Sequence, residues 1–96
     1  METIPMPNRT ACTIMSRYYF DMRDEQGVSP DEEGVECRDL DAVQDEAARS
    51  LLEMARDAVY RQSRVPCREM SMSIEVRDDV GPVMIARFAF EVLRRR

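Results

Sequence analysis

The chain has 96 residues, a formal charge of −5, and neither histidine nor tryptophan. The absence of histidine excludes Ser-His-Asp and Cys-His catalysis, a histidine general base near neutral pH, and imidazole metal ligands. The length fits one domain of limited stability. A hydrophobic content of 44% with 34% charged residues is typical of a globular protein and not of a disordered one.

The three cysteines, Cys12, Cys37 and Cys67, are widely spaced and form no CxxC motif. This spacing argues against a disulfide framework or a zinc site. No apolar run approaches the roughly 18 residues of a membrane span, and the first residues lack the apolar segment of a signal peptide. We therefore expect a cytoplasmic protein that binds no membrane, metal or cofactor.

Charge is unevenly distributed along the chain. Residues 18–57 sum to −9, whereas residues 58–96 sum to +3. Such a dipolar chain suits self-association or a partner with complementary patches. The simpler interpretation is local, because acidic side chains favour the start of a helix and arginines favour its end.

The first third of the chain predicts a tail followed by strands. Residues 1–15 contain two prolines and no periodicity, which predicts a disordered N-terminal tail. Residues 17–23 alternate between apolar and polar with the period of a half-buried strand. After a turn, residues 28–31 can form a short strand. Pro30 restricts this strand to the edge of the sheet, because proline has no amide hydrogen to donate. Residues 35–37 add a short extended segment.

A helix and two strands follow. From Asp39, the predicted N-cap, apolar residues recur every three or four positions, and Pro66 places the helix end near Gln62. Residues 70–77 and 83–88 alternate as strands joined by a hairpin connection. The alternation weakens after residue 88, where a short helical turn is the alternative.

The predicted order β-β-α-β-β gives an α+β fold for a single domain over residues 16–93. In this fold one amphipathic helix packs on one face of a small antiparallel sheet. The arginines at positions 94–96 form a basic C-terminal tail.

Cys37 is the best candidate for a reactive thiol because it precedes the predicted helix N-terminus, a position that lowers thiol pKa. The surrounding acids oppose that shift, and the chain has no histidine to act as a base. We expect a small buried side chain at this position. No residue is assigned a catalytic, cofactor-binding or metal-binding role.

A single helix leaves the other face of the sheet open. A solvated face is ordinary in an antiparallel sheet, but it can also serve dimerisation, partner docking or stacking with single-stranded nucleic acid. The candidate interaction residues on this open face combine arginines with a few apolar side chains: Arg17, Tyr19, Arg23, Arg77, Val83, Ile85 and Arg87.

Three segments of the chain carry a family resemblance: Arg17-Tyr18-Tyr19-Phe20, Asp31-Glu32-Glu33-Gly34-Val35-Glu36 and Asp39-Leu40-Asp41-Ala42. With these segments the chain resembles a family of short bacterial proteins that share a domain of unknown function. The resemblance covers about residues 15–90 and implies no activity, cofactor or catalytic residue. The layout is also distantly similar to small antitoxins that neutralise RNA-cleaving toxins.

The sequence therefore favours a non-enzymatic protein–protein interaction module, which forms a homodimer through the open sheet face or binds another small protein. The alternative is a nucleic-acid-binding or antitoxin-like regulator, whose arginines at positions 17, 23, 77 and 87 contact phosphates. The alternative has less support, because the chain is acidic overall and the face offers one aromatic side chain.

Overall fold

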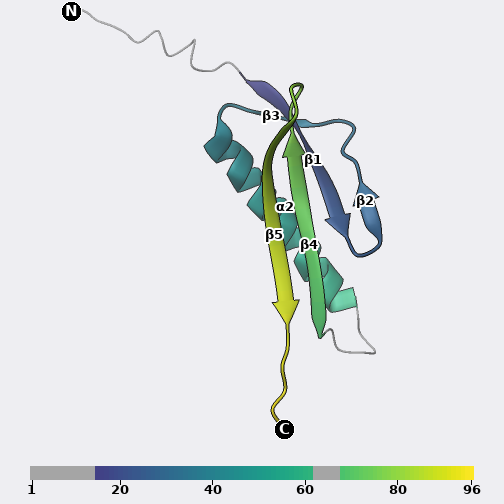
Figure 1. Ribbon diagram of the computed structural model, residues 1–96. Helices are drawn as coiled ribbons and strands as arrows, with labels where there is room; N and C mark the ends of the chain where they lie inside the picture. The colour runs from purple at the N-terminus through teal and green to yellow at the C-terminus, as the bar shows by residue number, and fades with distance from the viewer. Residues whose placement is uncertain (1–14, 62–67) are drawn as a thin grey trace, which may run out of the picture.

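The computed structural model describes residues 15–61 and 68–96, which form an antiparallel sheet and one helix (Figure 1). The α+β class and the predicted β-β-α-β-β arrangement are confirmed, and residues 35–37 form a short strand of their own. Residues 1–14 of the predicted tail lie outside the described part. The elements are β1 (Ser16–Asp24), β2 (Gly27–Ser29), β3 (Val35–Cys37), α2 (Leu40–Arg61), β4 (Glu69–Arg77) and β5 (Pro82–Glu91).

β1 organises the sheet because it has partners on both sides. One side pairs with β4, which in turn pairs with β5. The other side pairs with β3 at the beginning of β1 and with β2 at its end. All these pairings are antiparallel, and β5 is left as an edge strand with the order β2-β1-β4-β5.

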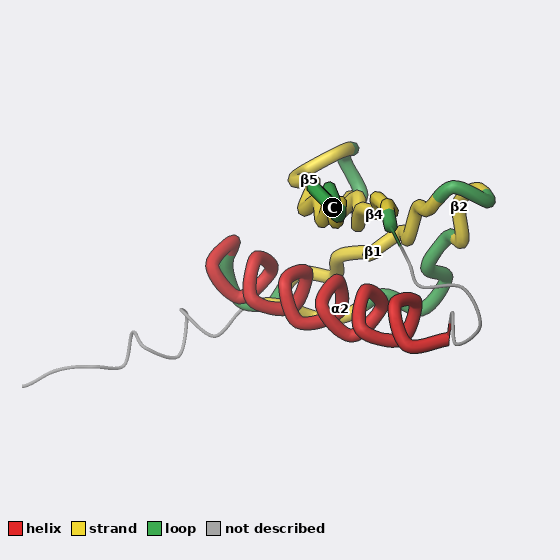
Figure 2. The backbone as a smooth tube through the Cα atoms, turned by 90° about the horizontal axis from the view of Figure 1, so that it is seen from below, coloured by secondary structure: helices red, strands yellow, loops and turns green. Residues whose placement is uncertain are grey.

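α2 begins as predicted. The Asp39 carboxylate accepts a hydrogen bond of 2.8 Å from the Ala42 amide, which satisfies one of the free donors of the first turn. The helix is described to Arg61, and its predicted end near Gln62 lies outside the described residues. It lies along one face of the sheet only (Figure 2). The face it buries repeats every four residues, at Val43, Ala47, Leu51 and Ala55.

β4 provides most of the sheet's contribution to the core. Its inward side chains, Met70, Met72, Ile74 and Val76, are all buried, as the alternation predicted. Phe20 of β1 joins them against the buried stripe of α2. In the described residues, no helix is long and apolar enough to cross a lipid bilayer.

β5 corrects one prediction. The helical turn that we considered after residue 88 is wrong, because the strand continues to Glu91 and Phe90 pairs with Met70. The Val92 amide extends the ladder by donating to the Arg68 carbonyl at 2.8 Å. The apparent loss of alternation came from a row of apolar residues, which an edge strand tolerates on both of its faces.

Candidate functional site

The open sheet face brings most of the candidate interaction residues together. Tyr19 and Arg23 of β1 lie beside Arg77 and Ser73 of β4, respectively. This is the face of the sheet that lies away from α2 (Figure 2). Ile85 and Arg87 of β5 continue the same rows, opposite Glu75 and Ser73.

Three of the four arginines on this face are neutralised within the chain. Arg77 Nε lies 2.8 Å from Asp21 Oδ2, and Arg23 Nε lies 2.8 Å from Glu75 Oε2. Arg17 pairs with Glu36 at 3.1 Å. An arginine that is already paired with a carboxylate offers less to a phosphate, so these contacts weigh against the nucleic-acid alternative.

Arg87 is the exception among these arginines, because it makes no ion pair with the described part of the chain. On the same face of β5, Glu91 is likewise without an ion pair to any described residue. Both side chains are exposed. The charges that remain available on this face therefore lie on the outermost strand.

Asp31 closes the other edge of the sheet. It lies in the loop between β2 and β3, where β1 has no strand partner. The Phe20 amide, which points into this gap, donates to Asp31 Oδ2 at 3.0 Å. Asp31 Oδ1 accepts from the Glu33 and Gly34 amides, each at 3.1 Å. One carboxylate thus replaces the missing strand and also orders the turn.

The Asp31 loop is also tied to the open face. The Asp31 amide donates to Asp21 Oδ1 at 2.8 Å, and Arg77 Nη2 donates to the Asp31 carbonyl at 3.1 Å. The Arg77 guanidinium lies over the Tyr19 ring, 4.6 Å from its centroid. We call Tyr19, Asp21, Asp31 and Arg77 the Asp31 clasp.

The pKa values of both carboxyls in the clasp lie below their usual value. The hydrogen bond from Arg77 lowers the pKa of Asp21 below its usual value, against an opposing effect of burial. Burial alone raises the pKa of Asp31, but the Phe20, Gly34 and Glu33 amides together bring it below its usual value. These groups satisfy one another, which is the arrangement of a structural cluster.

The clasp predicts a specific acid sensitivity. Because the folded-state pKa values of Asp21 and Asp31 lie below the unfolded-state value of 3.8, the two carboxylates stabilise the fold fully above that value. Their contribution decreases as the pH falls through 3.8 toward the folded pKa values. We expect urea midpoints to fall below about pH 4. An Asp21→Asn/Asp31→Asn variant should be less stable at neutral pH and lose less on acidification, and an equally steep loss would contradict this explanation.

Val83 does not lie where the alternation placed it. The register between β4 and β5 shifts next to Val76 and Arg77, so that Val83 is an extra residue between Pro82 and Met84. Such a bulge turns the extra side chain away from the regular alternation. Val83 is half-buried and packs against the core cluster, and it therefore drops out of the open face.

Cys37 is the small buried side chain that we expected. It is 5% exposed and belongs to the core cluster. Burial raises the pKa of its thiol, and the nearby Glu46 and Asp39 carboxylates raise it further. The position before the helix therefore does not produce a thiolate near neutral pH.

The outer edge of β5 is the largest unpaired strand edge among the described residues. Since the Val92 amide bonds to β4, alternate residues back along the strand also point their amides and carbonyls inward. The backbone groups of the residues between them point outward. These outward-pointing residues are Ile85, Arg87, Ala89 and Glu91.

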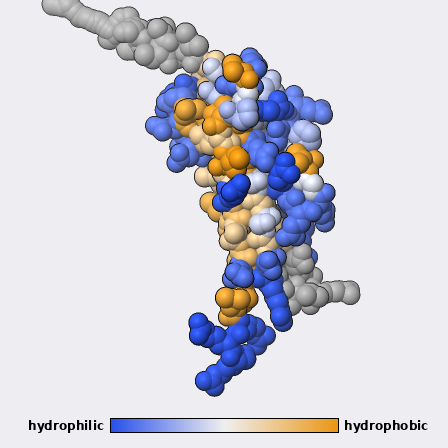
Figure 3. Space-filling model, in the orientation of Figure 1, coloured by the Kyte–Doolittle hydropathy of each residue, from blue (hydrophilic) through white to orange (hydrophobic). Residues whose placement is uncertain are grey.

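An apolar groove runs beside this edge. It has a volume of about 430 Å³ and lies between α2 and β5. Leu52, on the helix side, is 60% exposed. Hydrophobic residues gather along β5, whereas the side of β2 is mostly hydrophilic (Figure 3). On the helix side of β5, four apolar side chains remain only half-buried: Met84, Ala86, Phe88 and Phe90.

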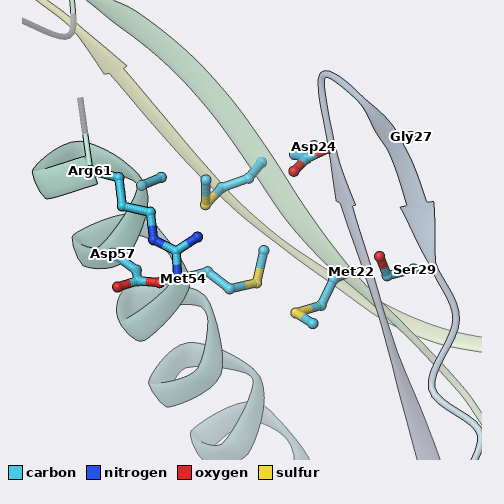
Figure 4. Close-up of a pocket in the computed structure, with 9 residues that line it drawn as sticks. Met22, Asp24, Gly27, Ser29, Met54, Asp57 and Arg61 are labelled. Atoms are coloured by element: carbon cyan, nitrogen blue, oxygen red, sulfur yellow. Dashed lines mark ion pairs between the residues drawn. The ribbon is translucent and has the colours of Figure 1, made fainter.

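A second, smaller pocket lies between the end of α2 and the β1–β2 hairpin (Figure 4). Its volume is about 250 Å³. Met22 and Met54 line it from opposite sides, and its helix rim carries an ion pair of 2.9 Å between Arg61 and Asp57. The two charges at this rim are paired with each other and offer little to a ligand. We therefore interpret the pocket as the open end of the hydrophobic core.

The fold and the candidate site define a small α+β domain with one closed and one open sheet edge. The family model described as a domain of unknown function (DUF6894) matches residues 17–89, and the chain belongs to this family. No curated protein and no solved structure matches the chain.

Two features of the site were missed from the sequence. Asp31 was predicted as the last residue of a short edge strand, although its position directly after Pro30 and three residues before Gly34 is typical of a turn-forming aspartate. The predicted interaction surface was the open face of the sheet, without the free edge of β5. The run from Val83 to Phe90, with no proline and one charge, was the available signal.

Proposed function

We propose that this protein is a small non-enzymatic module of the cytoplasm that binds a protein partner by strand addition along β5. The observation that carries the proposal is the free edge of this ten-residue strand, which lies beside an exposed apolar groove. A partner strand gains main-chain hydrogen bonds from such an edge and side-chain contacts from such a groove.

The contrast between the two edges of the sheet supports this choice. Proteins usually protect edge strands with short strands, prolines, charges or covering loops. The β1 side has such protection, in the form of two three-residue strands, Pro30 and the carboxylate of Asp31. β5 has Pro82 at its first residue only, and its side chains are mostly apolar.

The open sheet face is the weaker candidate surface. Much of it is occupied by ion pairs within the chain, and separating these pairs from water would cost free energy on binding. Its exposed apolar member, Ile85, is 54% exposed and belongs to β5. Contact through the face and contact along the edge therefore converge on this strand.

A backbone substitution tests the proposal. The Ala89 amide points away from β4, so Ala89→Pro should block an added strand while sparing the bonds inside the sheet. Ala89→Ser keeps the amide and is the matched control. We expect the wild type and Ala89→Ser to capture the same proteins from a lysate of the native host. The amount captured by Ala89→Pro should be lower by about tenfold or more. Quantitative mass spectrometry measures the three captures.

Equal capture by all three baits would contradict binding along β5. If nuclease treatment or moderate salt removed the captured material, the nucleic-acid alternative would replace the proposal, because phosphate binding weakens steeply with salt. Circular dichroism of Ala89→Pro shows whether the variant keeps the wild-type fold.

A further inference from the structure

We infer that the strand added to β5 is the β5 strand of a second copy of this chain, paired antiparallel about Ala89. This inference rests on the proposed function, because it names the partner of the same edge. The inference follows from the order of side chains along β5. When two copies of the strand run antiparallel, the side chains of one are complementary to those of the other.

The two faces of the strands match in such a pair. In an antiparallel ladder, directly opposed residues point to the same side. Pairing outward-pointing residues of one β5 with those of the other keeps both open faces on one side and both helices on the other. The backbone groups of Ile85, Arg87, Ala89 and Glu91 then meet their counterparts. The result is a continuous sheet across the two copies.

Charge selects the register. With Ala89 opposite Ala89, Arg87 of each copy lies opposite Glu91 of the other, which gives two opposite-charge pairs. Sliding one strand by two residues leaves Arg87 or Glu91 opposite Ala89, without a charge pair. Sliding it by four residues places Arg87 opposite Arg87, or Glu91 opposite Glu91, and so sets like charges directly against each other. Arg87 and Glu91, neither of which makes an ion pair with a described residue, thus complement each other across the two-fold axis.

The apolar residues agree with the same register. Leu93, 77% exposed, comes to lie opposite Ile85, and Val92, 42% exposed, opposite Ala86. On the helix side, Phe88 faces the second copy's Phe90, a close pair of aromatic rings. Exposed apolar side chains of each copy therefore cover the other, and the second copy's Val92 enters the groove beside α2.

The charge distribution of the chain fits this arrangement as well. Continuing the register places Arg94 of the second copy opposite Met84, which lines the groove together with Gln44 of α2. Asp41 and Asp45 lie on the same stretch of the helix. The basic C-terminus of one copy thus approaches the acidic first turns of the other's helix, as attraction between the two halves of a dipolar chain requires.

A charge exchange tests the register on the purified chain. Arg87→Glu and Glu91→Arg each replace two attractive pairs per dimer by two repulsive ones, so each should weaken the dimer about tenfold or more. The double variant Arg87→Glu/Glu91→Arg restores opposite charges and should return to within about threefold of the wild type. Sedimentation equilibrium measures the three dissociation constants.

Cross-linking reads the register directly. In a chain with Cys12 and Cys67 replaced by serine, Ala89→Cys places two thiols at the axis. Opposed Cα atoms in a hydrogen-bonded pair are about 5.5 Å apart, within the range of a disulfide. Ile85→Cys is the matched control, since its two copies lie more than about 20 Å apart. We expect an oxidised dimer with Ala89→Cys only.

The outcomes separate this inference from the proposed function. A wild-type chain that stays monomeric at about 200 µM overturns the self-pairing. If capture from the lysate still depends on the Ala89 amide, strand addition by another protein remains supported. A dimer that cross-links through Ile85→Cys, or that ignores the charge exchange, overturns the register. Loss of both self-association and amide-dependent capture overturns the proposed function itself.

Discussion

Asp31→Ala is expected to destabilise the fold by about 2–4 kcal/mol, a large share of the stability of a domain of this size. The carboxylate accepts three backbone amides, from Phe20, Glu33 and Gly34. Removing it leaves the Phe20 amide without its partner in a half-buried gap between two strands. It also releases the loop that holds Asp21 and Arg77 in place.

Urea unfolding followed by circular dichroism measures this loss. Asp24→Ala is the matched control, because its carboxylate is exposed and accepts one amide, that of Gln26. This control should lose only about 0.5–1 kcal/mol. Equal losses for the two variants would mean that Asp31 acts as an ordinary turn residue and not as the closure of the β1 edge.

Gly34→Ala is the second substitution with a large expected effect, also about 2–4 kcal/mol. Gly34 has a φ of +77°, a conformation that costs an alanine free energy. A Cβ atom there would meet Arg17 Cγ at 2.9 Å, and the Tyr18 carbonyl oxygen and Tyr19 Cε2 at 3.0 Å each. The backbone oxygen belongs to β1 and can move only by distorting the strand.

Gly27→Ala separates strain from collision. Gly27 has a φ of +134°, but a Cβ atom there has nothing within 4 Å. This variant should therefore lose clearly less stability than Gly34→Ala, by thermal or urea unfolding. If both lost the same amount, close packing of the loop on β1 would not be the reason for glycine at position 34.

Much of the fold could be predicted because its signals are local. The period of two in β4 and the period near four in α2 each come from one buried face, and Asp39 carries a capping carboxylate at the expected place. The end of β5 was missed because an edge strand need not alternate. The position of Val83 was missed because a bulge shifts the register without a signal in composition.

The candidate site could be predicted only in part. Alternation correctly placed Tyr19, Arg23 and Arg77 on one face, but it carries no information on which acids they meet. Arg77 pairs with Asp21 on the neighbouring strand and reaches the loop at Asp31, a contact 46 residues distant in sequence. Contacts of this kind depend on how the strands are ordered in the sheet, which the local pattern leaves open.

The closed edge of β1 limits how far such molecules can assemble. If each copy offers β5 and nothing comparable on its opposite side, pairing consumes the available edge of both partners. Assembly by strand pairing then stops at the dimer, because a filament needs two unpaired strand edges on every subunit. The Asp31 carboxylate accepts a hydrogen bond from the Phe20 amide and so fills the gap on the far side of the sheet. It thereby favours a dimer over open-ended aggregation.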